Sequence, residues 1–143
     1  SRAGMMVGSL LAGIAFSHSD VGSVHCMAES LGGVYDLPHG VCNAVLLPYV
    51  MEYNMSYCRD RYARVAKAMG VEPSGDGAAA AVDAVKALCA DVGLPAFSTL
   101  GVKVSDLDFL AEMSAKNGST PSNPRPMSKD DYLEVFRGAL LGA

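Results

Sequence analysis

Apolar residues recur at intervals of three and four along most of the chain, which is the repeat of one face of an α-helix. Near the C-terminus they follow the full i, i+3, i+4, i+7, i+8 pattern, as Tyr132, Val135, Phe136, Ala139 and Leu140. A second stripe lies within residues 56–69, among charged side chains, and consists of Cys58, Tyr62, Val65, Ala66 and Met69. No run of any length alternates between apolar and polar residues as a strand would. The pattern predicts an all-α fold, a bundle of six or seven helices without a sheet.

Helix-breaking residues and N-terminal capping signals set the helix boundaries that we expect. Helices are predicted over the ranges 3–17, 24–31, 39–53, 56–69 and 76–92. Two further helices are expected to open near Ser105 and Ser128, each the first residue of an S-x-x-D capping signal. Gly32 and Gly33 should break the chain into a turn, and Asp36 should cap the helix that follows.

The first predicted helix is rich in small residues, namely Gly4, Gly8, Ser9, Ala12 and Gly13. Glycine inside a helix costs up to about 1 kcal/mol relative to alanine, so we expect a packing reason, close approach of helices in a crowded core. His18 lies where this helix should end, and a histidine there interacts favourably with the helix dipole.

The length of 143 residues fits a single domain. Half of the residues are hydrophobic and the mean hydropathy is +0.23, high values for one isolated domain. We therefore expect further apolar surface to be buried against another domain or another subunit of a homo-oligomer. The net charge of −4, without any cluster of basic residues, argues against a nucleic-acid partner.

The cysteines, Cys26, Cys42, Cys58 and Cys89, all lie in apolar helical patterns and form no C-x-x-C pair. They are expected to be buried and reduced, as in a cytoplasmic protein. Residues 5–16 are apolar but too few to span a bilayer, so no membrane partner is expected. Because the chain opens on Ser1 without a methionine, it reads as a piece of a larger polypeptide.

His25 and His39 are the candidate metal ligands. Each lies in its own helix-compatible run, and a helix–turn–helix hairpin could bring the two imidazoles together. The alternative is two unrelated histidines, one capping a helix and one at the surface. Glu29 follows His25 by four residues and shares its helix face. It could be a third ligand, an acceptor for an imidazole N–H, or a solvated carboxylate.

Residues 25–48, which read HCMAESLGGVYDLPHGVCNAVLLP, resemble the signature of the iron-containing (group III) alcohol dehydrogenases. That signature is His-x-Met-Ala-His-x-Leu-Gly-Gly, a short turn, and then Pro-His-Gly-x-x-Asn-Ala-x-Leu-Leu-Pro. Residues 9–16 and 120–125 agree with the family as well. The resemblance covers most of the chain and implies the family's C-terminal domain, which is similar to the dehydroquinate synthase-like α-helical domain.

The resemblance also implies roles for individual residues. His25 and His39 match two of the four ligands of a catalytic divalent metal, Fe²⁺ or Zn²⁺, whose other ligands, an Asp and a His, would lie upstream of Ser1. Glu29 stands where the family usually has a histidine beside the nicotinamide and the substrate, so it is a candidate catalytic and cofactor-binding residue. Asn123 belongs to a segment resembling the one that returns toward the cofactor cleft, which makes it a second cofactor-binding candidate. The alternative for that segment is a proline-stiffened connector whose Arg125 pairs with a carboxylate.

The activity that the resemblance implies is oxidation of a primary alcohol to an aldehyde with NAD or NADP. Most of the cofactor's binding site would lie in an absent N-terminal domain. The isolated chain is then expected to bind metal weakly and to be inactive. A second hypothesis is a non-catalytic helical scaffold or oligomerisation module with a degenerate site at Glu29. A third is a self-contained zinc site of His25, Glu29 and His39. An upstream Asp-x-x-x-His pair would distinguish the enzyme from the scaffold.

Overall fold

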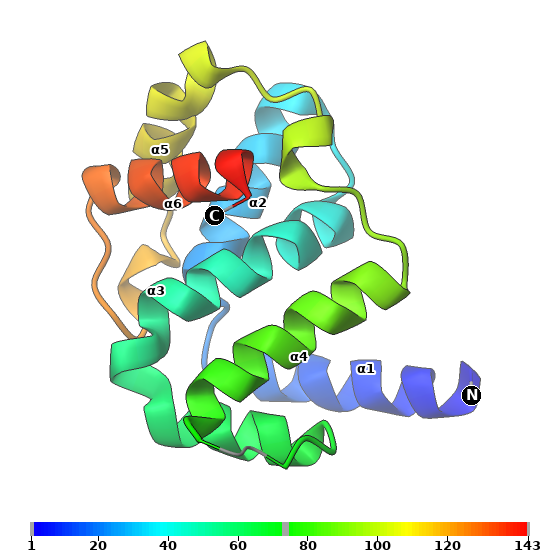
Figure 1. The fold of residues 1–143 in the computed structure, drawn as a ribbon. Coiled ribbons are helices and arrows are strands. Elements are labelled where there is room, and N and C mark those ends of the chain that lie inside the picture. Colours follow the sequence, from blue (N-terminus) through cyan, green and yellow to red (C-terminus); the bar gives the residue numbers. More distant parts are fainter. Residues whose placement is uncertain (1, 73–74, 143) are drawn as a thin grey trace.

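The computed structural model describes residues 2–72 and 75–142, and over these ranges it contains α-helices and short 3-10 helices but no strand. The α-helices are α1 (Arg2–Phe16), α2 (Gly22–Tyr35), α3 (His39–Ala68), α4 (Gly77–Asp91), α5 (Leu107–Ala115) and α6 (Lys129–Leu141) (Figure 1). The 3-10 helices are η1 (Phe97–Thr99), η2 (Val104–Asp106) and η3 (Thr120–Ser122). The predicted all-α class is confirmed, as is the number of helices in the part of the chain that the structure describes.

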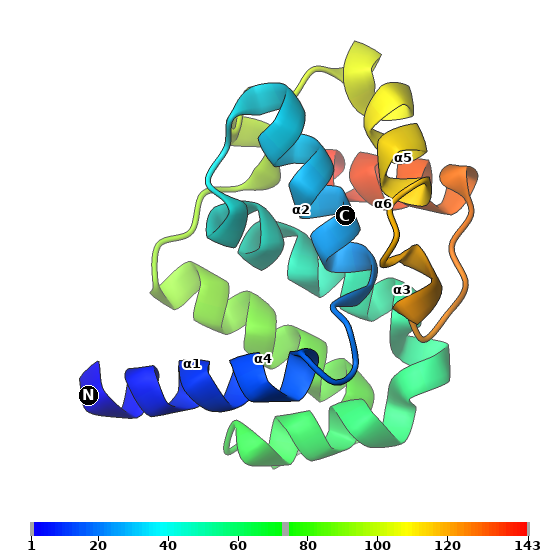
Figure 2. The same cartoon turned by 180° about the vertical axis from the view of Figure 1, so that it is seen from behind.

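The long helix α3 organises the bundle, because α2, α4 and α6 all pack against it (Figures 1 and 2). The main core joins α2, α3, α5 and α6, and its fully buried large side chains include Met27, Leu31, Leu46, Leu110, Tyr132 and Phe136. Burying each of them contributes roughly 1.5–3 kcal/mol, which holds α2, α3, α5 and α6 together. A smaller cluster between α3 and α4 contains Met51, Ala66, Ala81, Val82 and Val85.

The turn between α2 and α3 lies later than predicted. Gly32 and Gly33 are inside α2, which continues to Tyr35. Asp36 ends that helix in a left-handed conformation (φ 53°) and donates its N–H to the carbonyl of Gly32, so the predicted N-cap role for Asp36 is wrong. Aspartate tolerates this conformation better than most residues, and burial of Leu31 in the core outweighs the helix-breaking tendency of the glycines.

The predicted separation of helices 39–53 and 56–69 is also wrong. A single helix of 30 residues, α3, covers both ranges, with Pro48 buried inside it. Figure 1 shows that α3 is strongly bent between its first and second halves. Asn54, in the predicted gap, is buried and hydrogen-bonded, so the chain gains from remaining helical there.

Of the two predicted S-x-x-D helix-start signals, one caps its helix and the other does not. Ser128 and Asp131 form a complete capping box, in which the Asp131 carboxylate accepts from the Ser128 N–H at 2.8 Å. Ser105 does not cap α5, because its hydroxyl donates to the side chain of Asp106 and α5 begins only at Leu107.

Helix α1 does not lie in a crowded core. None of its residues is buried, and it projects from the side of the bundle (Figure 2). Its large apolar side chains are 51–74% exposed, namely Met5, Met6, Val7, Leu10, Leu11, Ile14 and Phe16. The packing that its small residues predicted is therefore not made within residues 2–72 and 75–142. The predicted role of His18 is supported, since its Nδ1 lies 2.9 Å from the carbonyl oxygen of Ile14 at the helix end.

The cysteines are mostly buried and form no disulfide, as the sequence predicted. Cys26, Cys42 and Cys58 are buried, Cys89 is partly buried, and all are free. Within the ranges described, no helix combines the length and apolar character needed to cross a membrane.

Candidate metal centre

The two candidate histidines come from different helices. His25 lies in the first turn of α2, and His39 is the first residue of α3. The connecting segment folds back along α2, since a Cβ built on Gly32 would lie 3.6 Å from the carbonyl oxygen of Leu37. This return, rather than a turn at the glycines, brings the start of α3 back against α2, where His39 meets His25.

The imidazoles converge. Nδ1 of His25 lies 3.1 Å from Nε2 of His39, and the ring centroids are 5.0 Å apart at 54°. Two nitrogens bound to one ion at roughly 2.1 Å, at angles of about 90–110°, are themselves roughly 3.0–3.4 Å apart. The spacing therefore fits two ligands of a single metal. Without a metal, one ring N–H donates to the other nitrogen, so the pair is satisfied in either state.

Asn43, which the sequence analysis did not single out, supports His39. It lies one helical turn further along α3, and its Nδ2 donates to the carbonyl of His39 at 3.1 Å and approaches Nε2 at 2.9 Å. When Nδ2 donates to Nε2, the ring proton of His39 lies on Nδ1. A metal bound at Nε2 would take that same lone pair, and Asn43 would then keep its bond to the carbonyl of His39. The i+4 spacing from His39 is the signal that could have revealed this residue.

The other end of the same amide has no partner. Oδ1 of Asn43 is buried and accepts no hydrogen bond from any residue that the structure describes. A buried carbonyl oxygen without a donor costs roughly 1–3 kcal/mol, and such groups concentrate where a ligand, ion or water completes a site. The position of this one beside His39 is consistent with a metal centre.

The surroundings keep His25 neutral. Partial burial and the neighbouring His39 lower the pKa of His25 from its ordinary value of 6.5, and they outweigh Glu29 and Asp20, which act in the opposite direction. A neutral imidazole is the form that binds metal.

Glu29 is exposed and engages a neighbour other than the histidines. Its Oε2 accepts a hydrogen bond from Nδ2 of Asn117 at 2.6 Å. Across the ranges 2–72 and 75–142, no three His, Cys, Asp or Glu side chains are placed to hold a metal together. This counts against the self-contained site of His25, Glu29 and His39. The catalytic and cofactor-binding roles of Glu29 stay predictions.

Asn123 is buried in a polar cluster. Its Oδ1 accepts from Nδ2 of Asn54 at 3.0 Å and from the N–H of Ser23 at 3.3 Å, while its Nδ2 donates to Oδ1 of Asn54 at 2.8 Å. These bonds join the start of α2, the middle of α3 and the loop after η3. The observed contacts of Asn123 are therefore structural, and its cofactor-binding role stays a prediction.

Arg125 makes no ion pair with a carboxylate in the described part of the chain, so that expectation is wrong. Its Nη1 donates to the carbonyl of Tyr53 at 3.0 Å, and its guanidinium lies 3.8 Å from the centre of the Tyr53 ring. The loop is a stiff connector, but the arginine is held by a carbonyl and an aromatic face.

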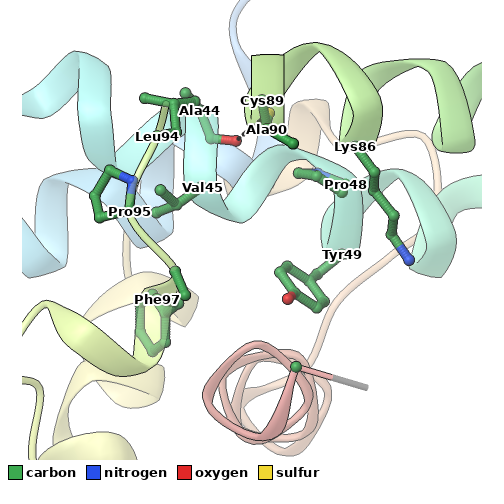
Figure 3. Close-up of a pocket in the computed structure, with 12 residues that line it drawn as sticks. Ala44, Val45, Pro48, Tyr49, Lys86, Cys89, Ala90, Leu94, Pro95 and Phe97 are labelled. Carbon is green, nitrogen blue, oxygen red and sulfur yellow. Dashed lines mark hydrogen bonds between the residues drawn. The ribbon is translucent and has the colours of Figure 1, made fainter. Parts of the chain in front are cut away.

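A separate cavity of about 270 Å³ lies between α3, α4 and the segment before η1 (Figure 3). Tyr49, Lys86 and Phe97 line it, together with small apolar side chains. Neither histidine nor Glu29 contributes to its walls, so it is not the candidate metal centre.

Comparison with known proteins identifies the family of this chain. Residues 1–140 match the model of the "Fe-containing alcohol dehydrogenase family, C-terminal". The 1,3-propanediol dehydrogenase of Citrobacter freundii is 44% identical over 98% of this chain, and the lactaldehyde reductase of Escherichia coli K12 is 40% identical over 94%.

Solved structures of related proteins share the fold of this chain. A crystal structure of a 1,3-propanediol oxidoreductase superposes on 92% of the chain with a TM-score of 0.89 and 44% identity, covering 36% of that protein. An alcohol dehydrogenase from Oenococcus oeni superposes on 90% with a TM-score of 0.87 and 44% identity, covering 35% of that protein. The chain spans 38% of the Citrobacter relative and 37% of the Escherichia relative. On fold and sequence together, it belongs to the Fe-containing alcohol dehydrogenase family and corresponds to that family's C-terminal part.

Proposed function

We propose that the full-length protein is a metal-dependent alcohol dehydrogenase that interconverts a primary alcohol and an aldehyde with NAD or NADP. This chain contributes the helical part that supplies two metal ligands, His25 and His39. The observation that carries the proposal is the 3.1 Å approach of Nδ1 of His25 to Nε2 of His39, from two separate helices. Relatives at 40–44% identity are named as a propanediol dehydrogenase and a lactaldehyde reductase, which supports a small alcohol or aldehyde as substrate.

Neutral imidazole suits both iron and zinc, and the family favours iron. When bound, the divalent ion supplies a Lewis acid that polarises the oxygen of the reacting alcohol or aldehyde. His25 and His39 fix its position from this side, because α2 and α3 are locked together by their shared core. Asn43 donates to the carbonyl of His39 at the start of α3, and partial burial lowers the pKa of His25, which favours its neutral form.

The remaining ligands, an Asp and a His, and most of the NAD(P) site are proposed to lie in the rest of the protein. Two imidazoles hold a divalent ion weakly, since metal sites of this kind need three or more protein ligands. We therefore expect the isolated chain to bind metal weakly and to oxidise no alcohol. The exposed apolar face of α1 is where we expect the rest of the protein or another subunit to pack. The cytoplasmic location and the homo-oligomer also stay predictions.

The test is metal dependence of the reaction. The full-length protein is stripped with a chelator, and NAD- or NADP-linked oxidation of small primary alcohols is measured before and after Fe²⁺ or Zn²⁺ is restored. The proposal predicts loss and recovery in the wild type, with no recovery in His39→Ala. Full activity in the stripped protein contradicts it. If the stripped and restored proteins are both inactive and His39→Ala keeps its metal, the scaffold hypothesis is favoured.

A further inference from the structure

The hydrogen bond between Glu29 and Asn117 joins two segments far apart in the chain. Oε2 of Glu29, on α2, accepts from Nδ2 of Asn117, just after α5, at 2.6 Å. Bonds from an amide donor to a carboxylate are among the stronger kinds in proteins. Glu29 also follows His25 by one helical turn, so the two side chains project from the same face of α2. A negative charge is thus held beside the histidine pair.

The orientation of the Asn117 amide is fixed independently of Glu29. Its Oδ1 accepts the backbone N–H of Ser119 at 2.9 Å, which directs Nδ2 away from its own loop and toward α2. The hydroxyl of Ser119 in turn donates to Oδ1 of Asp20 at 2.9 Å, just before α2 begins. Asn117 therefore presents a preset donor, and the group opposite it has to be an acceptor.

Glu29 keeps capacity to accept further hydrogen bonds. An ionised carboxylate offers about four acceptor positions on its two oxygens. Among the described residues, the Asn117 amide is the one side-chain donor that it engages, and Glu29 is exposed. An open, oriented acceptor remains next to the candidate metal centre.

Resting on the proposed function, we propose that Glu29, positioned by Asn117, selects alcohols that carry a second hydrogen-bond donor. That donor is a hydroxyl or an ammonium group two or three carbons from the reacting carbon. Side chains at i and i+4 are roughly 5–6 Å apart at Cβ. Oxygens on the first and third carbons of an alcohol are roughly 4–5 Å apart when single bonds are near 1.5 Å. The two spans are of similar size, and the proposal places the second donor of an alcohol held at the histidine pair at Glu29.

The selection has a simple energetic origin. A purely alkyl substrate removes water from the carboxylate and returns no hydrogen bond, whereas a hydroxyl or ammonium replaces the lost water. Glu29 is then the specificity-determining residue and Asn117 a positioning residue.

The test uses the metal-loaded full-length protein. The ratio of kcat/KM for 1,3-propanediol to that for 1-propanol is measured, and the same ratio for 3-amino-1-propanol. Glu29→Gln should lower both ratios by about 10- to 100-fold, more for the ammonium than for the hydroxyl. Glu52→Gln, which removes a partly exposed carboxylate paired with Lys86 elsewhere, should change neither ratio.

A second readout does not depend on turnover. In zinc-loaded protein labelled with ¹⁵N-asparagine, the side-chain amide resonance of Asn117 should shift on addition of 1,3-propanediol and remain in place on addition of 1-propanol. If both alcohols move it equally, or neither does, the inference is overturned.

Variants at position 117 separate support of the fold from selection. Asn117→Asp keeps the acceptor for the Ser119 N–H and loses the donor to Glu29, so both ratios should fall while the loop is retained. In Glu29→Gln/Asn117→Asp the bond is restored with reversed polarity. The melting temperature should then recover, but the ratios should not.

The outcomes keep the two proposals apart. Recovery of the ratios in the double variant, or unchanged ratios in Glu29→Gln with activity retained, overturns this inference and leaves the proposed function standing. A protein that oxidises none of these alcohols with any metal overturns the proposed function, and this inference with it.

Discussion

Nδ1 of His25 and Nε2 of His39 lie 3.1 Å apart, although the two residues are fourteen positions apart in the chain. The approach depends on the backbone segment before α3, which returns along α2 past Gly32. The histidine pair is therefore assembled by the packing of two helices within this chain. Its geometry already matches two ligands of one ion.

Asn43 should affect metal affinity through its contacts with His39. Asn43→Leu removes both contacts of Nδ2, the one with the carbonyl of His39 and the one with Nε2, so the imidazole is held less firmly. Loss of such a supporting contact typically weakens metal binding by about 10- to 100-fold. Competition with a chelator of known affinity, applied to full-length protein, measures the change. An affinity equal to that of the wild type would show that the amide does not position His39 for the metal.

The stability of the metal-free chain should depend on the protonation of His25. The pKa of His25 is lowered in the folded state, mainly by burial and next by His39, from an ordinary value of 6.5. The unfolded state therefore takes up the proton first, and stability present above pH 6.5 is lost as the pH falls below that value.

Urea unfolding of the chain between pH 8 and pH 5 measures this loss. A His25→Gln variant, which has no titrating group, should show a smaller loss over about the same range. If the wild type and the variant lose stability in parallel, His25 is not the group responsible.

Asn123 should matter to stability whether or not a cofactor is present. Asn123→Asp keeps the acceptor for the Ser23 N–H but loses both donors, including the one to Oδ1 of Asn54. A buried carbonyl left without its donor costs roughly 1–3 kcal/mol. Chemical denaturation without NAD(P) should reveal this loss, and adding Asn54→Ala should make the Asn123→Asp effect smaller. A wild-type free energy of unfolding in Asn123→Asp would mean that the cluster is not structural.

The two S-x-x-D signals offer a matched pair of cap variants. Ser128→Ala removes a hydroxyl that accepts from the N–H of Asp131 in a complete capping box, and it should cost about 1 kcal/mol of unfolding free energy. Ser105→Ala removes an exposed hydroxyl that caps no helix, and its effect should stay within about 0.5 kcal/mol. Equal losses in the two variants would contradict this assignment of the caps.

The sequence was sufficient for the helical class because the apolar stripes are long and regular. The stripe from Tyr132 to Leu140 became the buried face of α6, as its spacing predicted. Local signals failed where packing overruled them. Gly32 and Gly33 remain helical because neighbouring Leu31 is buried, and the turn moved to Asp36.

The candidate site was predictable only in part. The run around His25 and His39 identified the histidines, but their convergence depends on how the segment before α3 returns, which no periodicity encodes. The contact of Asn117 with Glu29 could not be predicted from the sequence, because the two residues are 88 positions apart. Helix α1 shows the same limit, since its small residues predicted close helix packing and none of its residues is buried by the part of the chain that the structure describes.

The central claim is that His25 and His39 together bind one metal ion. It is tested most directly by the metal content of purified full-length protein in three variants. His25→Ala and His39→Ala should each lose most of the bound metal, while His18→Ala, which removes an exposed histidine at the end of α1, should retain it. Retention of metal at the wild-type level in both His25→Ala and His39→Ala would contradict the account.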